Sequence, residues 1–209
     1  MDNRYKNVKV VNYLNKIAYY RLSLGNLLPD LNKIIYLDSD LIIYEDLTNL
    51  FNLNFNGYLM LSRKIPKEMK NATNSLRINT GVLLLNLKKM REMKLEENIL
   101  KIINEGFVSS VQDQGLLIQY YLDQIGYLNE KYNLPTQGFK SLIYFYNNNK
   151  LNDKSNDLLY ATNHPVIRHF NGPKKSNLYI NSKDWWYFAS KGKYFPKILE
   201  LKNNNTYKI

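Results

Sequence analysis

The sequence predicts an α/β fold in which a mixed sheet is flanked by helices. Short apolar segments rich in Ile, Leu and Val alternate with longer segments whose apolar residues recur at helical spacing. One of the short segments, residues 79–87, is apolar almost throughout, which indicates a strand buried on both faces. With 209 residues and 44% hydrophobic content, the chain is long enough to bury a substantial core in one domain.

The predicted elements follow one another without a visible linker or internal repeat, and their alternation is typical of a sheet covered on both faces. In order along the chain they are a helix over 11–28, strands over 34–37 and 41–44, a helical turn over 46–51, a strand over 57–63, a loop or short helix over 64–77, a strand over 79–87, a helix over 88–107, a helix from 113 onward, and a strand followed by a loop over 127–135.

Proline, glycine and capping residues set the ends of the predicted helices. Pro29 ends the first helix, and Gly106 lies near the end of the helix over 88–107. Ser110, with Asp113 three residues later, predicts the start of the next helix. The apolar residues expected on one face of that helix are Leu116, Leu117, Tyr120, Tyr121 and Ile125.

Composition excludes several classes of site and partner. The chain has no cysteine, which rules out disulfides and thiolate chemistry and is typical of a cytoplasmic protein. The formal charge of +11 comes from scattered basic residues without a zinc module, an RNP motif or a basic helix, so no nucleic-acid partner is expected. No apolar run is long enough to span a bilayer, and the N-terminus has no apolar signal-peptide core. We therefore expect a cytoplasmic protein.

Two acids interrupt the otherwise apolar stretch KIIYLDSDLIIY, residues 33–44. Asp38 and Asp40 stand between two β-leaning segments, and ionising both costs free energy unless water, a shared proton or a cation compensates. A solvated Asp-Ser-Asp turn is one interpretation. The other is a divalent metal shared with substrate phosphates, because ligands of α/β sheets gather at the carboxyl ends of strands.

One of the two histidines, His169, precedes a Gly-Pro-Lys-Lys run. It is either a hydrogen-bonded structural residue or a third metal ligand, with the Gly-Pro turn bringing backbone amides and a lysine close to a phosphate. Two carboxylates and one imidazole suit Mn²⁺ or Mg²⁺, and the nitrogen ligand favours Mn²⁺.

Three further polar residues are ambiguous when each is taken alone. Asn79 stands at the head of an apolar strand, where a plain turn explains it equally well. Asp113 and Gln114 open a predicted helix, where a capping residue and a surface residue are equally common.

Five segments taken together, in order, resemble family 8 glycosyltransferases, the retaining GT-A enzymes that include bacterial lipopolysaccharide galactosyl- and glucosyltransferases and glycogenin. The resemblance runs from about residue 17 to about residue 175. The segments are YYRLSLGNLLPDLNKIIYLDSDLIIYEDLTNLF (19–51), RINTGVLLLNLKKM (77–90), VQDQGLLIQYYL (111–122), IGYLNEKYNLPT (125–136) and IRHFNGPKK (167–175).

The resemblance implies a metal site and a diphosphate site. It assigns Asp38, Asp40 and His169 to Mn²⁺, with Mg²⁺ as the alternative ion. Gly172 and Lys175 would contact the diphosphate of the donor. A metal ion and a lysine would stabilise the negative charge that collects on a nucleoside diphosphate as the glycosidic bond breaks.

The resemblance also implies residues around the donor sugar. Arg21 would lie near the donor's phosphate and sugar, and Asn79 would line the sugar. Asp113 and Gln114 would be the catalytic residues, orienting hydroxyls and steadying an oxocarbenium-like centre. Gln114 is a poor nucleophile, so retention is expected through front-face attack guided by the departing phosphate and not through a covalent intermediate.

The implied activity is that of a metal-dependent hexosyltransferase, which moves a hexose from a UDP-sugar to a glycan or glycolipid of the cell surface, such as lipopolysaccharide. The alternative is a catalytically inactive fragment that acts in binding or assembly. Metal-dependent phosphoester hydrolysis is a third hypothesis, supported by the acid pair alone. The stretch DWWYFASKGKYFPK (184–197) suits peripheral contact with the inner face of a membrane, although core packing explains Trp185 and Trp186 slightly better.

The chain departs from the family pattern at three places. It is expected to start after the family's N-terminal nucleotide-binding half, with residues 1–16 matching only its tail. The family's Asp-Gln-Asp becomes Asp-Gln-Gly at 113–115, and its Lys-Pro-Trp becomes Lys-Ser-Asn at 175–177. We therefore expect one partial GT-A domain over 1–209, with a basic and aromatic tail over 176–209. A truncated sheet exposes apolar surface, so self-association is also expected.

Overall fold

The computed structural model describes residues 3–9, 16–65, 77–135, 159–170, 183–193 and 196. In chain order, the elements are η1 (Lys16–Ser23), α1 (Leu24–Leu27), β1 (Lys33–Leu37), β2 (Leu41–Ile43), α2 (Thr48–Phe51), β3 (Met60–Ile65), β4 (Arg77–Asn86), α3 (Leu87–Glu92), α4 (Leu95–Asn104), α5 (Gln112–Tyr120), η3 (Leu122–Gln124), β5 (Ile125–Leu128), η4 (Glu130–Tyr132), β6 (Leu134–Pro135), β7 (Ile167–His169) and α8 (Lys183–Ser190).

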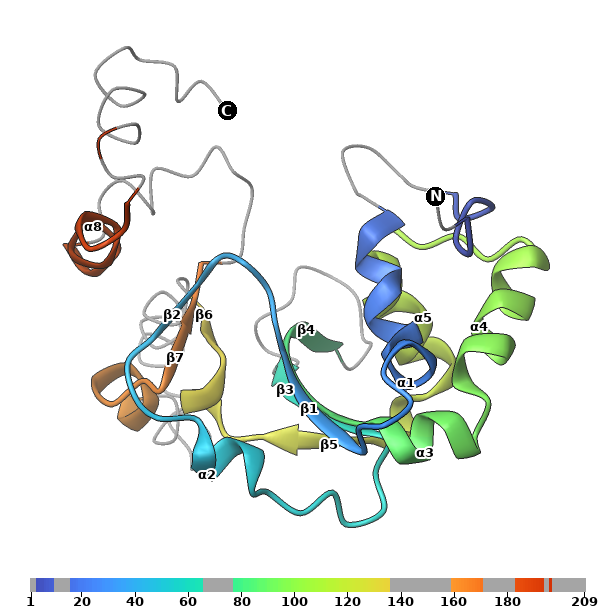
Figure 1. Cartoon of the computed structure of the whole chain (residues 1–209), viewed down its shortest axis with the longest axis horizontal. Helices are drawn as coiled ribbons and strands as arrows, with labels where there is room; N and C mark the ends of the chain where they lie inside the picture. Colours follow the sequence, from blue (N-terminus) through green and yellow to red (C-terminus); the bar gives the residue numbers. More distant parts are fainter. Residues whose placement is uncertain are drawn as a thin grey trace, which may run out of the picture.

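The strands form two mixed sheets. The larger has the order β1-β4-β3-β5, in which β4 runs antiparallel to both of its neighbours and β5 runs parallel to β3. The smaller has the order β2-β7-β6, with β2 antiparallel and β6 parallel to β7. Helices α1, α3, α4 and α5 lie on one side of the larger sheet, and the smaller sheet lies on the other side (Figure 1).

Strand β4 supplies both cores of the molecule. Leu83 and Leu85 pack with the helices, while Val82 and Leu84 point to the opposite face and pack with the smaller sheet. All four side chains are fully buried. Because successive side chains of a strand point to opposite faces, an unbroken apolar segment is the pattern that a doubly covered strand requires. The prediction for residues 79–87 is therefore confirmed.

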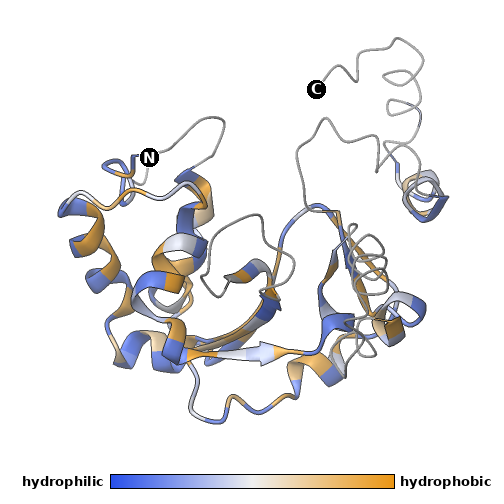
Figure 2. Ribbon diagram, turned by 180° about the vertical axis from the view of Figure 1, so that it is seen from behind, coloured by the Kyte–Doolittle hydropathy of each residue, from blue (hydrophilic) through white to orange (hydrophobic). Residues whose placement is uncertain are grey.

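The helices that cover β4 are amphipathic. Apolar and polar residues alternate around them in Figure 2. In α4, the buried side chains Leu95, Ile99 and Ile103 recur every four residues, which places them on one face of the helix. Hydrophobic burial of this stripe, and not helix propensity, is the main stabilising contribution for helices this short.

Most strand positions agree with the predictions. The two segments around the acids are β1 and β2, and the predicted helical turn contains α2. The predicted strand over 57–63 starts later and ends later, as β3. None of the helices within the described ranges is both long and apolar enough to cross a membrane.

Two helix predictions are wrong. The segment 88–107 is not one helix, because α3 ends at Glu92 and α4 begins at Leu95, with Lys94 between them in the left-handed region (φ 49°). The chain turns at this break, so that α3 packs against β1 while α4 packs against α3 and η1.

The start of the next helix also differs from the prediction. Ser110 is not its cap, because α5 begins at Gln112 and the residue at the cap position is Val111. Gln112 itself has a positive φ of 51°. The predicted apolar face is shorter than expected, since Tyr120 is exposed and Ile125 belongs to β5.

Several predictions fall outside the described residues. They concern residues 66–76 of the predicted loop, the residues Gly172 and Lys175, and most of the tail over 176–209.

Lys94 gives a direct test of the break between α3 and α4. The left-handed region costs a residue with a side chain about 1–2 kcal/mol, and glycine is free of that cost. We expect Lys94→Gly to raise the free energy of unfolding by about 0.5–1 kcal/mol in urea titrations. Lys101→Gly, inside α4, is the matched control and should lower it by about 1 kcal/mol. Destabilisation by both variants would contradict the assigned break.

Candidate active site

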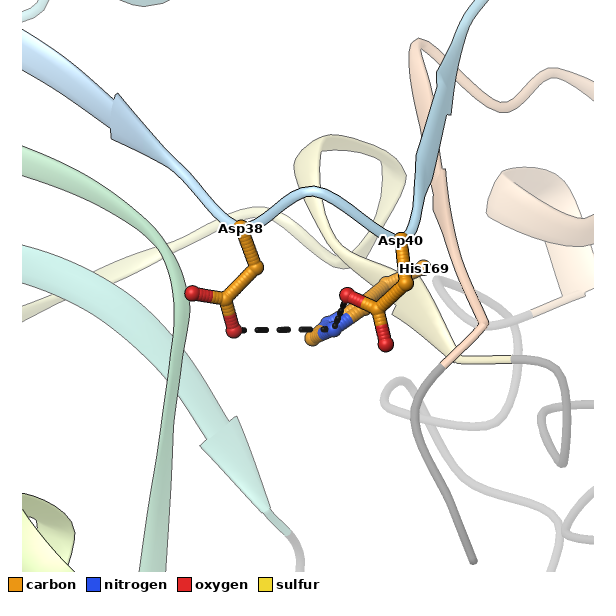
Figure 3. Close-up of side chains that lie close together, drawn as sticks. All are labelled: Asp38, Asp40 and His169. Carbon is orange, nitrogen blue, oxygen red and sulfur yellow. Dashed lines mark ion pairs between the residues drawn. The ribbon is translucent and has the colours of Figure 1, made fainter. Parts of the chain in front are cut away.

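The two acids and the histidine meet where the two sheets join. Asp38 directly follows β1, and Asp40 directly precedes β2. His169 ends β7, where it is paired with Leu41 of β2. The amide of Phe170 donates to the carbonyl of Asp40 at 2.9 Å, which fixes the ends of these strands side by side. Figure 3 shows the imidazole lying between the two carboxylates.

The three side chains form a compact cluster. The Nε2 atom of His169 lies 3.2 Å from Oδ1 of Asp40 and 3.9 Å from Oδ2 of Asp38. One ligand atom from each residue can be chosen so that all lie within 4.8 Å of one another. The imidazole is buried, whereas the Asp40 side chain is 40% exposed. The cluster therefore opens to solvent on the side of Asp40.

Gly81 makes room for the imidazole. A Cβ atom on this glycine would lie 2.0 Å from Cε1 of His169 and under 3 Å from both ring nitrogens. The carbonyl of Gly81 also accepts a hydrogen bond from the amide of Asp38, at 2.8 Å. A residue larger than glycine would displace the ring, so this position in β4 determines where the histidine lies.

A buried arginine links the cluster to α5. Arg21 of η1 is 7% exposed, and its guanidinium lies 3.3 Å from Asp38 and 3.4 Å from Asp113. It also donates to the carbonyl of Thr80 at 2.5 Å and stacks over the ring of Tyr36 at 4.5 Å. The guanidinium thus holds three segments of the chain around one positive charge.

Tyr36 contacts the cluster of Asp38, Asp40 and His169 and was not identified from the sequence. Its hydroxyl donates to Oδ1 of Asp38 at 2.9 Å. Burial raises the pKa of Tyr36 to about 12, so the hydroxyl keeps its proton. The signal was present, because residues two apart on a strand share a face, and Tyr36 precedes Asp38 by two.

Asp113 lies in the first turn of α5 and is buried, at 2% exposure. Burial raises the pKa of its carboxyl to about 6, against the opposing effect of the Arg21 guanidinium, which lowers it. The carboxylate is therefore ionised at neutral pH, where its charge faces that of the arginine.

Asn79 and Gln114 both hold the start of β4. The Oδ1 atom of Asn79 accepts from the amide of Gly81 at 3.0 Å and from Nδ2 of Asn133 at 2.8 Å. Oε1 of Gln114 accepts from the amide of Thr80 at 3.2 Å. Asn133 also contacts His169, with its Oδ1 atom 2.9 Å from Nδ1 of the imidazole. This contact was not predicted, because no sequence pattern links two residues 36 positions apart.

Packing explains why Gly115 stands where the family motif has its third acid. A Cβ on Gly115 would lie 1.9 Å from Oγ of Ser109. The segment before α5 therefore occupies the space that a side chain at this position would need.

The charges around the cluster fit a divalent cation. Among the described residues in contact here, Asp38, Asp40 and Asp113 carry three negative charges and Arg21 carries one positive charge, which leaves two negative charges beside the imidazole. Two carboxylates and one imidazole are ligands that Mn²⁺ and Mg²⁺ accept. The residues present therefore fit the ion that the resemblance implies.

A cavity of about 570 Å³ lies apart from this cluster, between β7 and α8. Arg168 lines it and pairs with Asp184 at 2.8 Å. Arg168 and His169 are consecutive in β7, so their side chains point to opposite faces of the sheet. The cavity is consequently not part of the cluster.

Comparison with known proteins supports the same family. The family model of glycosyl transferase family 8 matches residues 2–180. Glycosyltransferase GlyB of Streptococcus pneumoniae is 24% identical over 200 residues, which are 87% of this chain and 47% of GlyB. The chain spans about half the length of the first curated relatives that it matches.

Solved structures share the fold. The bifunctional glycosyltransferase WbbM matches with a TM-score of 0.72 and 16% identity, covering 92% of this chain and 38% of WbbM. The galactosyltransferase LgtC, solved with donor and acceptor sugar analogs, matches with a TM-score of 0.58 and 20% identity, covering 83% of this chain and 65% of LgtC. The predicted fold class is thus confirmed, and the chain belongs to glycosyl transferase family 8.

Proposed function

We propose that this chain carries the donor-binding and catalytic residues of a retaining glycosyltransferase that uses a UDP-hexose. The observation that carries the proposal is the cluster of Asp38, Asp40 and His169 at the junction of the two sheets. A cluster of hard oxygen ligands with one imidazole, open on one side, suits an ion that also binds diphosphate oxygens.

In the proposed reaction, the bond between C1 of the hexose and the β-phosphate oxygen breaks, and UDP leaves with the bonding electrons. An acceptor hydroxyl forms the new bond to C1 on the same face, and its proton passes to the departing phosphate oxygen. A divalent ion held by Asp38, Asp40 and His169 would supply charge stabilisation for the diphosphate. Gly172 and Lys175, which lie outside the described residues, are proposed as further diphosphate contacts.

Arg21, Asp113, Asn79 and Gln114 are proposed to position the donor sugar. The support is their mutual contact: Arg21 bridges Asp38 and Asp113, and the two amides hold the start of β4 beside them. Held rigidly, these groups would orient sugar hydroxyls without reorganising during the reaction. Gln114 is a poor nucleophile, so front-face attack remains the proposed route to retention.

The acceptor is proposed to be a cell-surface glycan or glycolipid. The aromatic residues of α8 are the observation behind a membrane-proximal acceptor, since Tyr187 is 60% exposed and Phe188 is 39% exposed. The lipopolysaccharide acceptor, the cytoplasmic address, the self-association and the boundary of the tail stay predictions from the sequence.

Asp40→Asn tests the metal site most simply, because the side chain is partly exposed and its loss should leave the fold intact. We expect Mn²⁺-dependent UDP binding, measured by calorimetry, to weaken by more than about tenfold, since even indirect ligand support is worth that much. Glu92→Gln, an exposed acid on α3, is the matched control. Equal UDP binding by wild type and Asp40→Asn would mean that the acids form only a turn. Failure of the folded wild type to bind millimolar UDP with Mn²⁺ would favour an inactive binding module.

Gly81→Ala tests the contact between β4 and the imidazole. The added methyl group must push His169 away, so we expect Mn²⁺-dependent UDP binding to weaken by more than about tenfold and the stability to fall by about 1–3 kcal/mol. Gly192→Ala, at the end of α8, is the control, because its Cβ would meet only the carbonyl of Ala189, at 3.3 Å. Wild-type UDP affinity in Gly81→Ala would show that the position of His169 does not matter.

Asp113 gives stability a distinct pH dependence. Its folded pKa of about 6 lies above the ordinary value of 3.8, so the native state holds this proton more tightly than the unfolded state does. The resulting contribution to stability is full below pH 4 and is lost as the pH rises through 6. Asp113→Asn has no carboxyl group at this position, so its stability lacks this pH-dependent contribution.

The free energy of unfolding of the wild type, minus that of Asp113→Asn, should therefore fall by up to about 3 kcal/mol between pH 4 and pH 7. Urea titrations of both proteins at each pH measure the difference. A difference that is constant, or that rises with pH, would show that the charge of Arg21 outweighs the burial of the carboxyl.

A further inference from the structure

We propose that Asn133 is a positioning residue that, together with Asn79, fixes the tautomer of His169. The imidazole then carries its proton on Nδ1 and directs the lone pair of Nε2 toward Asp38 and Asp40. This inference deepens the proposed function, because it concerns the histidine of the proposed metal site.

The backbone amide of Gly81 fixes the orientation of the first side chain, because it can act only as a hydrogen-bond donor. It donates to a side-chain atom of Asn79 at 3.0 Å. That atom must therefore be the amide oxygen, Oδ1, since an NH₂ group has no acceptor to offer. One orientation of the Asn79 amide follows from the backbone.

The same oxygen fixes the next residue. Oδ1 of Asn79 accepts a second hydrogen bond, at 2.8 Å, from the side-chain amide of Asn133. The Asn133 atom in this contact must be a donor, so it is Nδ2, and the other side-chain atom is Oδ1. Oδ1 of Asn133 lies 2.9 Å from Nδ1 of His169. A carbonyl oxygen cannot donate, and Nδ1 must consequently carry the proton.

A proton on Nδ1 determines the state of the other ring nitrogen, Nε2. In a neutral imidazole with its proton on Nδ1, Nε2 has a lone pair, and here Nε2 lies 3.2 Å from Oδ1 of Asp40 and 3.9 Å from Oδ2 of Asp38. Three electron-rich atoms face one another, an arrangement that a shared cation stabilises. The outer partner of a ligating histidine commonly sets its tautomer and orientation in this way.

The structure holds Asn133 firmly enough for this role. Its side chain is buried, with the residue 1% exposed. The backbone amide of Asn133 donates to the carbonyl of Glu130 at 3.1 Å. The carboxylate of Glu130 in turn accepts a hydrogen bond from Arg63 of β3, at 2.5 Å. The next residue, Leu134, pairs with Arg168 in the smaller sheet. Asn133 directly precedes β6, which pairs with β7, so Asn133 and His169 have little freedom to separate.

The competing explanation is that these amides only satisfy buried polar groups, which nearly all native structures achieve. That explanation predicts no preferred tautomer once the contact to Nδ1 is replaced. The tautomer of His169 in metal-free variants of Asn133, compared with that of the wild type, therefore separates the two explanations, and it does not depend on any catalytic activity.

The experiment uses the full chain labelled with ¹⁵N-histidine, at about two pH units above the ordinary imidazole pKa. The chain has only two histidines, so His164→Gln assigns the signals. The ¹⁵N shifts of the ring nitrogens report which one carries the proton. We expect the Nδ1–H tautomer of His169 in the wild type. A predominant Nε2–H tautomer would overturn the proposal.

Two substitutions of Asn133 complete the test. Asn133→Leu removes the acceptor at similar volume, so the Nε2–H tautomer should appear and the affinity for Mn²⁺ alone should fall about 10–100-fold. Asn133→Asp keeps an acceptor for Nδ1–H and loses only the donor to Oδ1 of Asn79, so the Nδ1–H proton should persist in this variant. Circular dichroism checks that each variant is folded.

The outcomes separate this inference from the proposed function. A folded Asn133→Leu that keeps the Nδ1–H tautomer overturns the positioning role, and if that variant does not fold, loss of the Nδ1–H tautomer in Asn133→Asp does so instead. A wild type that shows the Nδ1–H tautomer but does not bind Mn²⁺ supports the hydrogen-bond chain and overturns the proposed metal site.

Discussion

The close approach of the His169 ring to Gly81 determines how the rest of the site is arranged. The histidine lies about 130 residues after the two acids in the chain, and the pairing of β2 with β7 brings it beside Asp40. That pairing alone would not suffice, because β4 runs past the same point and any side chain at 81 would occupy the volume of the imidazole. The larger sheet thus presents the backbone of Gly81 without a side chain, and the smaller sheet positions the imidazole ring against it. Both sheets must form before the cluster exists.

Charge balance is the second constraint on this region. Burying an arginine and a carboxylate beside a second, partly exposed carboxylate is costly unless their charges compensate one another. Arg21 meets that condition by lying between Asp38 and Asp113, and the ring of Tyr36 covers its guanidinium. One cation is not enough for the acids present once Asp40 is included. The remaining negative charge of the described residues is what supports the proposed divalent ion, and it links the folding of η1 and α5 to the properties of the cluster.

Much of this could be predicted from the sequence, and the failures have identifiable causes. The acids, the histidine and the doubly buried strand follow from residue type and local pattern, and these residues do lie together. The break at Lys94 was not predictable by periodicity, because the apolar spacing continues through it and tertiary packing on the sheet overrides local preference. Asn133 was not predictable either, since its contact with His169 joins two segments far apart in sequence. Tyr36 could have been found from strand alternation alone.

We propose that Asp38, Asp40 and His169 together hold one divalent ion. Crystals of the full chain grown with MnCl₂ and UDP, with diffraction data collected at the manganese absorption edge, test this directly. We expect one anomalous peak within bonding distance of both carboxylates and of Nε2 of the imidazole. A peak that excludes His169, or a nucleotide bound with no manganese at this junction, would contradict it.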